Sequence, residues 1–417
     1  MEARETAEGV ARASYGKLVA FLAARTRDVA GAEDALSEAF ASALADWPAN
    51  GIPRSPEAWL LTVARRKLID AARRRRAGDD AAPTLALLAD ELDDADGEAH
   101  IPDKRLALMF ACAHPAIDPA ARAPLILQTI LGFDAATIAS AFLVAPATMG
   151  QRLVRAKGKI REAGIPLVVP DGSELGGRLS AVLEAIYAAF AEGWTDAVGA
   201  DERRRNLAEE AIWLGRLVAS LLSQEPEALG LVALMLHAES RRCARRNAQG
   251  EYVPLAEQDP ALWNTSLIDE AESLLFRASR LGRPGRYQLE AAVQSAHVVR
   301  RRTGRADWTA IEKLYDALLA LTGSPVVAIN HAVALGETRG PAAGLAALDA
   351  VARDPRLAQY QPYWAARAGL LAGMGDAAGA DRAYEQAIGL EYDPAVRRFL
   401  QGRRSMLNLE HSKEETK

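Results

Sequence analysis

The most informative stretch of this 417-residue sequence is residues 134–162, DAATIASAFLVAPATMGQRLVRAKGKIRE. Asp134 is a good N-cap for a short helix that extends to Phe142, because its carboxylate can accept hydrogen bonds from the first backbone N–H groups. Residues 143–145 then form a tight turn, and Pro146 suits the first turn of a second, longer helix. Two helices joined by such a short turn are typical of a helix–turn–helix.

The second of these helices has two chemically different faces. The apolar face, which we expect to pack on the preceding helices, carries Met149, Leu153, Ala156 and Ile160. The opposite face carries donor-rich side chains that suit base edges and phosphates in a major groove: Thr148, Gln151, Arg152, Arg155 and Lys159. The alternative is a solvated basic face on an ordinary helical hairpin. The spacing, the proline and the separation of faces together favour DNA binding.

A second basic helix is predicted over residues 56–76, PEAWLLTVARRKLIDAARRRR. Its buried stripe is predicted to be Leu60, Ala64, Leu68 and Ala71. The side chains left pointing outward are Trp59, Thr62, Arg66 and Arg73. Cations beside an aromatic ring can hold a single strand through phosphate contacts and base stacking. Basic amphipathic helices are also common in proteins that bind no nucleic acid, and Trp59 could instead belong to the core.

A third element, residues 32–40, reads AEDALSEAF. Asp34 and Glu38 lie four residues apart and therefore share one helix face. Paired carboxylates invite an acid–base role, but no histidine partner or glycine-rich loop accompanies them. An acidic knob that contacts a basic partner protein fits better. Surface solubility is the competing interpretation.

The formal net charge of −5 hides a strong local asymmetry. The basic segments 65–76 and 152–161 flank an acidic one, 78–98, that contains no Lys or Arg. Alanine and leucine dominate and alternating strand patterns are absent, so we predict an all-α fold. The length favours two or three domains. We divide the chain into a helical module (8–77), an acidic linker (78–100), a helix–turn–helix module (101–166) and a large helical region (175–410).

Several classes of protein are disfavoured by what the sequence lacks. The two cysteines, Cys112 and Cys243, are far apart and form no ligand set with the six histidines, so we expect no disulfide, metal or cofactor. No nucleophile–base pair or phosphate loop is visible, so an enzyme is disfavoured. No apolar run approaches the ~20 residues that cross a bilayer, and the charged start is no secretory signal. We therefore predict a cytoplasmic protein.

The large helical region ends with repeat-like sequence. Residues 363–388 combine small and aromatic side chains across a predicted helix–turn–helix, and Pro394 follows. This pattern resembles a tetratricopeptide unit. A looser copy extends over residues 330–355. We therefore expect helix pairs that stack along the chain.

In this order the three elements resemble those of extracytoplasmic-function (ECF) sigma factors, over about the first two-fifths of the chain. The resemblance implies that Asp34, Glu38 and Phe40 dock on the clamp helices of the largest subunit of core RNA polymerase. It implies that the helix with Trp59, Thr62, Arg66 and Arg73 opens and reads the −10 element. It further implies that residues 132–162 read the −35 element. One position departs, since many members carry Asn where this chain has Arg66.

The remaining chain resembles a subgroup of ECF factors with a long, tetratricopeptide-like C-terminal extension. The resemblance rests on stretches such as 225–231, 255–263 and 324–330, whereas FAEGW at 190–194 departs from the usual FNEGY. It implies regulation by the fused extension, with an effector protein or a ligand as a further partner. The alternative is a helix–turn–helix regulator fused to a repeat-type sensor, which would not need the acidic segment around Asp34 and Glu38.

Overall fold

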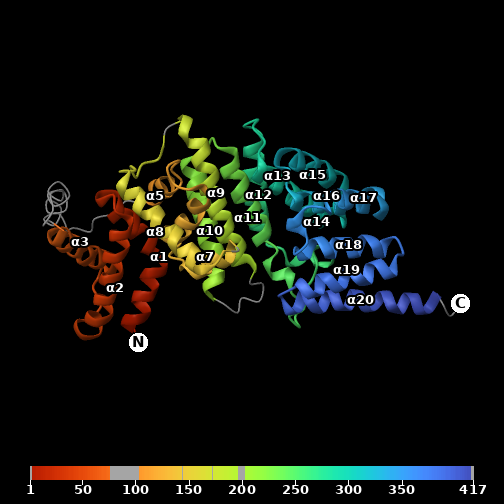
Figure 1. The fold of residues 1–417 in the computed structure, drawn as a ribbon, viewed down its shortest axis with the longest axis horizontal. Coiled ribbons are helices and arrows are strands. Elements are labelled where there is room, and N and C mark those ends of the chain that lie inside the picture. The colour runs from red at the N-terminus through yellow and green to blue at the C-terminus, as the bar shows by residue number, and fades with distance from the viewer. Residues whose placement is uncertain (1, 76–102, 143, 171, 196–201, 415–417) are drawn as a thin grey trace. The chain divides into compact units, whose positions relative to one another are not determined.

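The computed structural model describes residues 2–75, 103–142, 144–170, 172–195 and 202–414 (Figure 1). The chain forms two compact units, residues 1–192 and 193–417. Helices account for nearly all of the regular structure, and no strand occurs in the described part, where one isolated bridge joins Arg246 to Tyr252. The predicted all-α fold is confirmed. No helix in these ranges is long and apolar enough to cross a membrane.

The first unit is a bundle whose helices begin and end at clear sequence signals. The Asp28 carboxylate caps the second helix by accepting from the Gly31 N–H at 3.0 Å, and Asp118 caps a later one through the Ala120 N–H at 2.9 Å. The helices are α1 (Glu2–Thr26), α2 (Val29–Asn50), α3 (Pro56–Arg75), α5 (Arg105–Cys112), α6 (Pro119–Leu131), α7 (Ala135–Ala141), α8 (Pro146–Glu162) and α9 (Gly172–Thr195), which crosses the division between the units.

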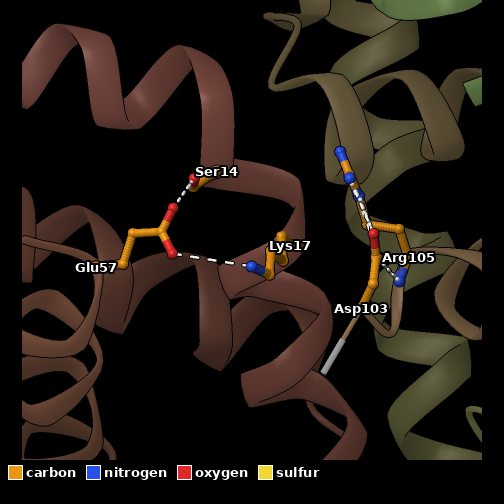
Figure 2. Close-up of polar contacts among 5 residues, drawn as sticks. All are labelled: Ser14, Lys17, Glu57, Asp103 and Arg105. Atoms are coloured by element: carbon orange, nitrogen blue, oxygen red, sulfur yellow. Dashed lines mark hydrogen bonds and ion pairs between the residues drawn. The ribbon is translucent and has the colours of Figure 1, made fainter. Parts of the chain in front are cut away.

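Lys17 on α1 lies between two acidic side chains, Glu57 of α3 and Asp103 just before α5 (Figure 2). Glu57 of α3 accepts a hydrogen bond from the Ser14 hydroxyl and lies 3.8 Å from the Lys17 ammonium. On the other side, Asp103 forms an ion pair of 2.9 Å with Arg105 at the start of α5. Burial raises the pKa of Asp103, but hydrogen bonds from Arg105 and the charge of Lys17 outweigh burial and hold this pKa below its ordinary value.

Helices α1 and α6 approach each other so closely that only glycine fits between them. A Cβ atom on Gly16 would overlap the carbonyl oxygen of Ile130. Gly9, seven residues earlier on α1, has open space around it. The glycine at position 16 is therefore a packing requirement of this contact, not a general property of α1.

Helix α8 packs on α2 through a nearly buried ion pair. Lys157 donates to the Glu33 carboxylate, and the two side chains are only 13% and 12% exposed. Arg161 of α8 lies 3.8 Å from Asp28, the N-cap of α2. Burial raises the pKa of Glu33, and the Lys157 charge opposes that rise. A carboxylate in this setting is costly unless its partner stays in place.

The second unit is a succession of helices and short 3-10 turns. Its α-helices are α10 (Glu202–Leu221), α11 (Pro226–Glu239), α12 (Thr265–Ser279), α13 (Arg286–Val298), α14 (Arg300–Thr303), α15 (Trp308–Thr322), α16 (Pro325–Arg339), α17 (Pro341–Val351), α18 (Gln361–Gly373), α19 (Ala377–Leu390) and α20 (Pro394–Glu414). The 3-10 turns are η1 (Arg242–Arg245), η2 (Leu255–Glu257), η3 (Pro260–Leu262) and η4 (Pro355–Leu357).

Helix α11 lies at the centre of this unit and is buried on almost every side. It packs against α10, α12 and α13. Gly230 allows the backbone at Gln288 to come close, because a Cβ atom there would lie 2.6 Å from the Gln288 nitrogen. The Glu227 carboxylate accepts from the N–H groups of Tyr287 (3.0 Å) and Gln288 (3.1 Å), so α11 supplies the N-terminal cap of α13.

The end of the unit consists of consecutive helix pairs, α16 with α17 and α18 with α19, followed by α20. Gly340 (φ +92°) and Gly375 (φ +80°) make the reversals within the pairs, at backbone angles that favour glycine. Small side chains line the contacts: a Cβ atom on Gly344 of α17 would lie 2.6 Å from the Ala332 carbonyl oxygen of α16. The helix pairs expected in this region are present.

We expect Gly16→Ala to destabilise the first unit by about 1–3 kcal/mol, because the added methyl group must push α1 away from α6. Gly9→Ala is the matched control on the same helix. It should stabilise by about 0.5–1 kcal/mol through helix propensity alone. Urea unfolding of both full-length variants measures the difference. Equal effects at the two positions would contradict the close contact.

Lys157→Ala should cost about 3–5 kcal/mol of unfolding free energy, because it leaves the Glu33 carboxylate buried without its partner. Lys159→Ala, two residues along and exposed, should change stability by less than about 0.5 kcal/mol. The double variant Glu33→Gln with Lys157→Ala should recover part of the loss. If Lys157→Ala and Lys159→Ala unfold alike, the ion pair is not a structural element.

Candidate nucleic-acid interface

Helices α7 and α8 form the helix–turn–helix that the sequence predicts. The Asp134 carboxylate accepts from the N–H groups of Ala136 (2.9 Å) and Thr137 (2.8 Å). These hydrogen bonds, the Thr137 backbone foremost, hold the pKa of Asp134 below its ordinary value. Pro146 occupies the first turn of α8. The cap and the proline therefore fix where each helix of the motif begins.

The predicted separation of faces on α8 is confirmed. Its buried residues are Met149, Leu153, Ala156 and Ile160. Among the predicted DNA-binding side chains, Arg152 is half-buried, and the exposed ones are Thr148, Gln151, Arg155 and Lys159. The helix thus presents one continuous stripe of hydrogen-bond donors to solvent.

The cations of α8 divide into two groups with different surroundings. Lys157 and Arg161 face acidic groups of α2. Arg152, Arg155 and Lys159 form no ion pair within the described residues. Their charge is therefore uncompensated at the surface, which is the condition for attracting a polyanion such as a phosphate backbone.

Val154 is an apolar member of the same stripe that sequence reasoning missed. Its side chain is 71% exposed and lies three residues after Gln151, beside Arg155. Helical spacing could have revealed it, because positions three apart share a face. An exposed β-branched side chain among donors can contact the methyl group of thymine, the one apolar feature of a major-groove edge.

Helix α3 buries Leu60, Ala64 and Leu68, three of its four predicted stripe residues, and Ala71 is half-buried. Of the predicted strand-binding residues on this helix, Arg66 is exposed. Thr62 is half-buried, and its hydroxyl donates to the Ala58 carbonyl at 2.9 Å. The side chain of Arg73 lies outside the described residues.

Trp59 does not point freely outward as predicted. It is half-buried, and its ring meets the ring of Trp47 edge to face with centroids 5.6 Å apart. Trp47 lies near the end of α2 and is itself buried. The cause is that α2 and α3 pack along each other, which brings the two indoles together. Trp59 therefore presents only part of its ring to solvent.

The acidic side chains of α2 differ in their solvent exposure. Asp34 and Glu38 are exposed, and Glu38 forms a 3.0 Å ion pair with Lys67 of α3. Phe40 is half-buried. Glu33, which no sequence pattern singled out, is the buried acid that pairs with α8. The acidic linker predicted over 78–100 lies outside the described residues.

Comparison with known proteins gives matches in both halves of the chain. Residues 10–78 match the model of sigma-70 region 2, and residues 178–279 match a family of unknown function, DUF6596. The chain is 41% identical over 366 residues to an uncharacterized protein, R00370, of Rhizobium meliloti (strain 1021), and the match covers 86% of each chain. No solved structure matches it.

The region 2 match covers α2 and α3, the helices that carry the acidic segment and the basic face described above. Sigma-70 factors are non-enzymatic initiation factors that bind core RNA polymerase and promoter DNA. The similarity to the Rhizobium protein extends over most of both chains, so the two share one architecture beyond region 2. The chain belongs to the same family as that protein, and its region 2 domain, residues 10–78, supports membership of the sigma-70 family.

Proposed function

We propose that this protein is an ECF-type sigma factor that directs core RNA polymerase to its own set of promoters, with α8 reading the −35 element. The observation that carries the proposal is the coexistence of a region 2 match with a helix–turn–helix whose second helix exposes an unpaired stripe of donors. Region 2 alone fits any sigma-70 member. The added module gives the two-site arrangement that the ECF resemblance implies.

The polymerase contact is assigned to the exposed acids of α2. Asp34 and Glu38 protrude on one face, with Phe40 half-buried beside them. Both carboxylates are accessible, and the exposed pair of Glu38 with Lys67 can give way to a basic, partly apolar partner such as the clamp helices. The −10 contact is assigned to α3, where Arg66 is exposed and Trp59 keeps part of its ring accessible. Arg73 completes this group by its place in the sequence.

Neither DNA contact needs to be strong by itself. The net charge of −5 disfavours free binding to DNA, and the few cations exposed on α8 give only a modest phosphate attraction. When polymerase holds both contacts at once, the second becomes intramolecular, and effective concentration converts weak contacts into a stable complex. Promoter recognition by this chain would therefore depend on the polymerase.

The C-terminal unit is assigned a regulatory role as a tetratricopeptide-like extension. The pairs α16–α17 and α18–α19 support this assignment through their glycine reversals and close small-residue contacts. Arrays of helix pairs commonly present a binding surface to a partner. The rival function, a DNA-binding regulator with a repeat-type sensor, is disfavoured by the region 2 match, because such a regulator needs no polymerase-docking helix.

Reconstituted transcription separates the two functions. The full chain with core RNA polymerase, and no other sigma factor, should produce transcripts from specific promoters of a genomic fragment library. A regulator of the rival kind would give no transcript in this mixture, because core polymerase alone does not initiate at promoters.

Glu38→Lys should weaken binding to core polymerase by roughly tenfold, about 1.4 kcal/mol, while leaving the fold intact. The matched control is Lys67→Ala, which breaks the same 3.0 Å ion pair but keeps the carboxylate. Exposed pairs contribute little to stability, so both variants should fold normally. Affinity measured with labelled core polymerase decides the matter, and equal affinities for both variants would remove Glu38 from the interface.

Val154 should recognise a thymine methyl group in the −35 element. Replacing that one thymine with deoxyuracil removes only the methyl group, and should weaken initiation about fourfold, or about 0.8 kcal/mol. Val154→Ala should show a similar loss and become insensitive to the replacement, whereas Lys159→Ala should stay sensitive. If no −35 thymine responds to deoxyuracil while transcription proceeds, Val154 reads no base and the sigma assignment survives.

A further inference from the structure

Four arginines crowd the turn that follows α11, and only two of them have acidic partners. Arg242 pairs with Glu239 at 2.6 Å, and Arg246 pairs with Asp393. Arg241 and Arg245 form no ion pair within the described residues. This turn therefore carries more positive charge than its acids neutralise.

The unpaired arginines are held by neutral acceptors instead. Arg241 Nη2 donates to the side-chain oxygen of Gln294 at 2.5 Å, and its Nε donates to the His237 carbonyl at 3.3 Å. Arg245 Nη1 donates to the Trp194 carbonyl at 2.6 Å, and the Arg245 guanidinium stacks on the Trp194 ring at 3.7 Å from its centroid. These contacts orient the guanidinium groups without cancelling their charge.

The crowding takes place at low solvent exposure. Arg241 is only 8% exposed, and the side chain of Arg246 is 10% exposed. Arg246 Nε and Nη1 are buried with no hydrogen-bond partner, although Nη2 binds Asp393. Arg245 is half-buried, so solvent reaches this group. Buried donors without acceptors cost free energy, and buried cations without anions cost more.

The Arg246 guanidinium lies over the Tyr252 ring, 6.0 Å from its centroid. Burial raises the pKa of Tyr252, and the charges of Arg245, Arg246 and Arg241 oppose that rise, whereas the charge of Glu391 adds to it. Burial lowers the pKa of both Arg241 and Arg245 to about 10; repulsion from Arg245 adds to the effect at Arg241. Partly buried cations that lack acidic partners, with unpartnered donors on Arg246 beside them, would be stabilised by a bound anion.

The neighbouring histidines do not supply or neutralise charge. Burial lowers the pKa of His297 to about 4, with further lowering from Arg241 and Arg300. Burial and the Arg241 charge also lower the pKa of His237 to about 4, although Glu272 lies 3.4 Å from its Nε2. Burial and the Arg241 charge outweigh that half-exposed carboxylate. Both histidines are therefore neutral at pH 7, and the excess positive charge stays on the arginines.

We propose that Arg241, Arg245 and Arg246, together with Tyr252, form a binding site for phosphate or for the phosphate group of a small molecule. Guanidinium groups match phosphate oxygens in pairs of parallel hydrogen bonds, and several of them suit a tetrahedral dianion better than a planar monoanion. The site joins Trp194, the turn after α11, Gln294 of α13 and the segment before α20. Its occupancy would tie together parts of the second unit that are distant in sequence, whether or not the chain binds promoters.

The test is binding of inorganic phosphate to the full-length chain at constant ionic strength, with chloride as the balancing anion. Calorimetry should give saturable binding, and phosphate should raise the unfolding temperature of the chain. Arg245→Gln should weaken binding by at least about tenfold, because it removes a charged donor from a partly solvent-accessible position. Arg245→Lys keeps the charge but loses the fork and should weaken binding less.

Arg283→Gln is the matched control in the same unit. Arg283 is exposed, donates to the Gln224 carbonyl at 2.7 Å and lies 3.7 Å from Glu225, so its loss should leave phosphate affinity unchanged. Binding that is not saturable, or that Arg245→Gln and Arg283→Gln reduce equally, would overturn the proposal. Competition by acetate as strong as that by phosphate would overturn the assignment to phosphate. The assay contains no DNA or polymerase, so its outcome is independent of the sigma assignment.

Discussion

The ion pair between Lys157 and Glu33 determines how the basic helix α8 is oriented in the first unit. A carboxylate that is 12% exposed needs a partner that does not leave, and Lys157 supplies it from the side of α8 that faces α2. The apolar line of Met149, Leu153 and Ile160 fixes a second direction, toward the interior of the unit. These two contacts leave one side of α8 facing solvent. That side carries the unpaired donors.

Helix geometry also decides which acidic side chains of α2 face α8 and which face solvent. Successive residues of a helix point about 100° apart, so Glu33 and Asp34 cannot face the same partner. Glu33 faces α8, whereas Asp34 and Glu38 stay in solvent one step around the helix. The surface that holds the two helical modules together and the surface proposed for polymerase therefore lie on one helix without competing for the same side chains.

The sequence could predict those features of the interface that depend on local periodicity. The two faces of α8 and the Asp134 cap follow from spacing within one segment, and the structure confirms both. Long-range contacts leave no such local signal. Lys157 and Glu33 are 124 residues apart in the chain, and nothing in either segment identifies the other. The outward orientation predicted for Trp59 is wrong for the same reason, because its ring packs against Trp47 on another helix. Val154 was within reach, since it lies three residues from Gln151.

The two units place their arginines in opposite electrostatic settings, and burial explains the difference. In the first unit α8 is amphipathic, so its unpaired cations lie in solvent, where a long polyanion can reach them side by side. In the second unit the arginines after α11 lie at mixed depth, because Arg241 is 8% exposed whereas Arg245 is half-buried and Cys243 between them is exposed. The more deeply buried of these cations lose part of their hydration, although solvent still reaches the group at Arg245. A single half-buried position open to solvent suits a small anion better than a polymer, in keeping with the phosphate site that we propose there, whereas the exposed cations of α8 suit the nucleic acid that we propose for them.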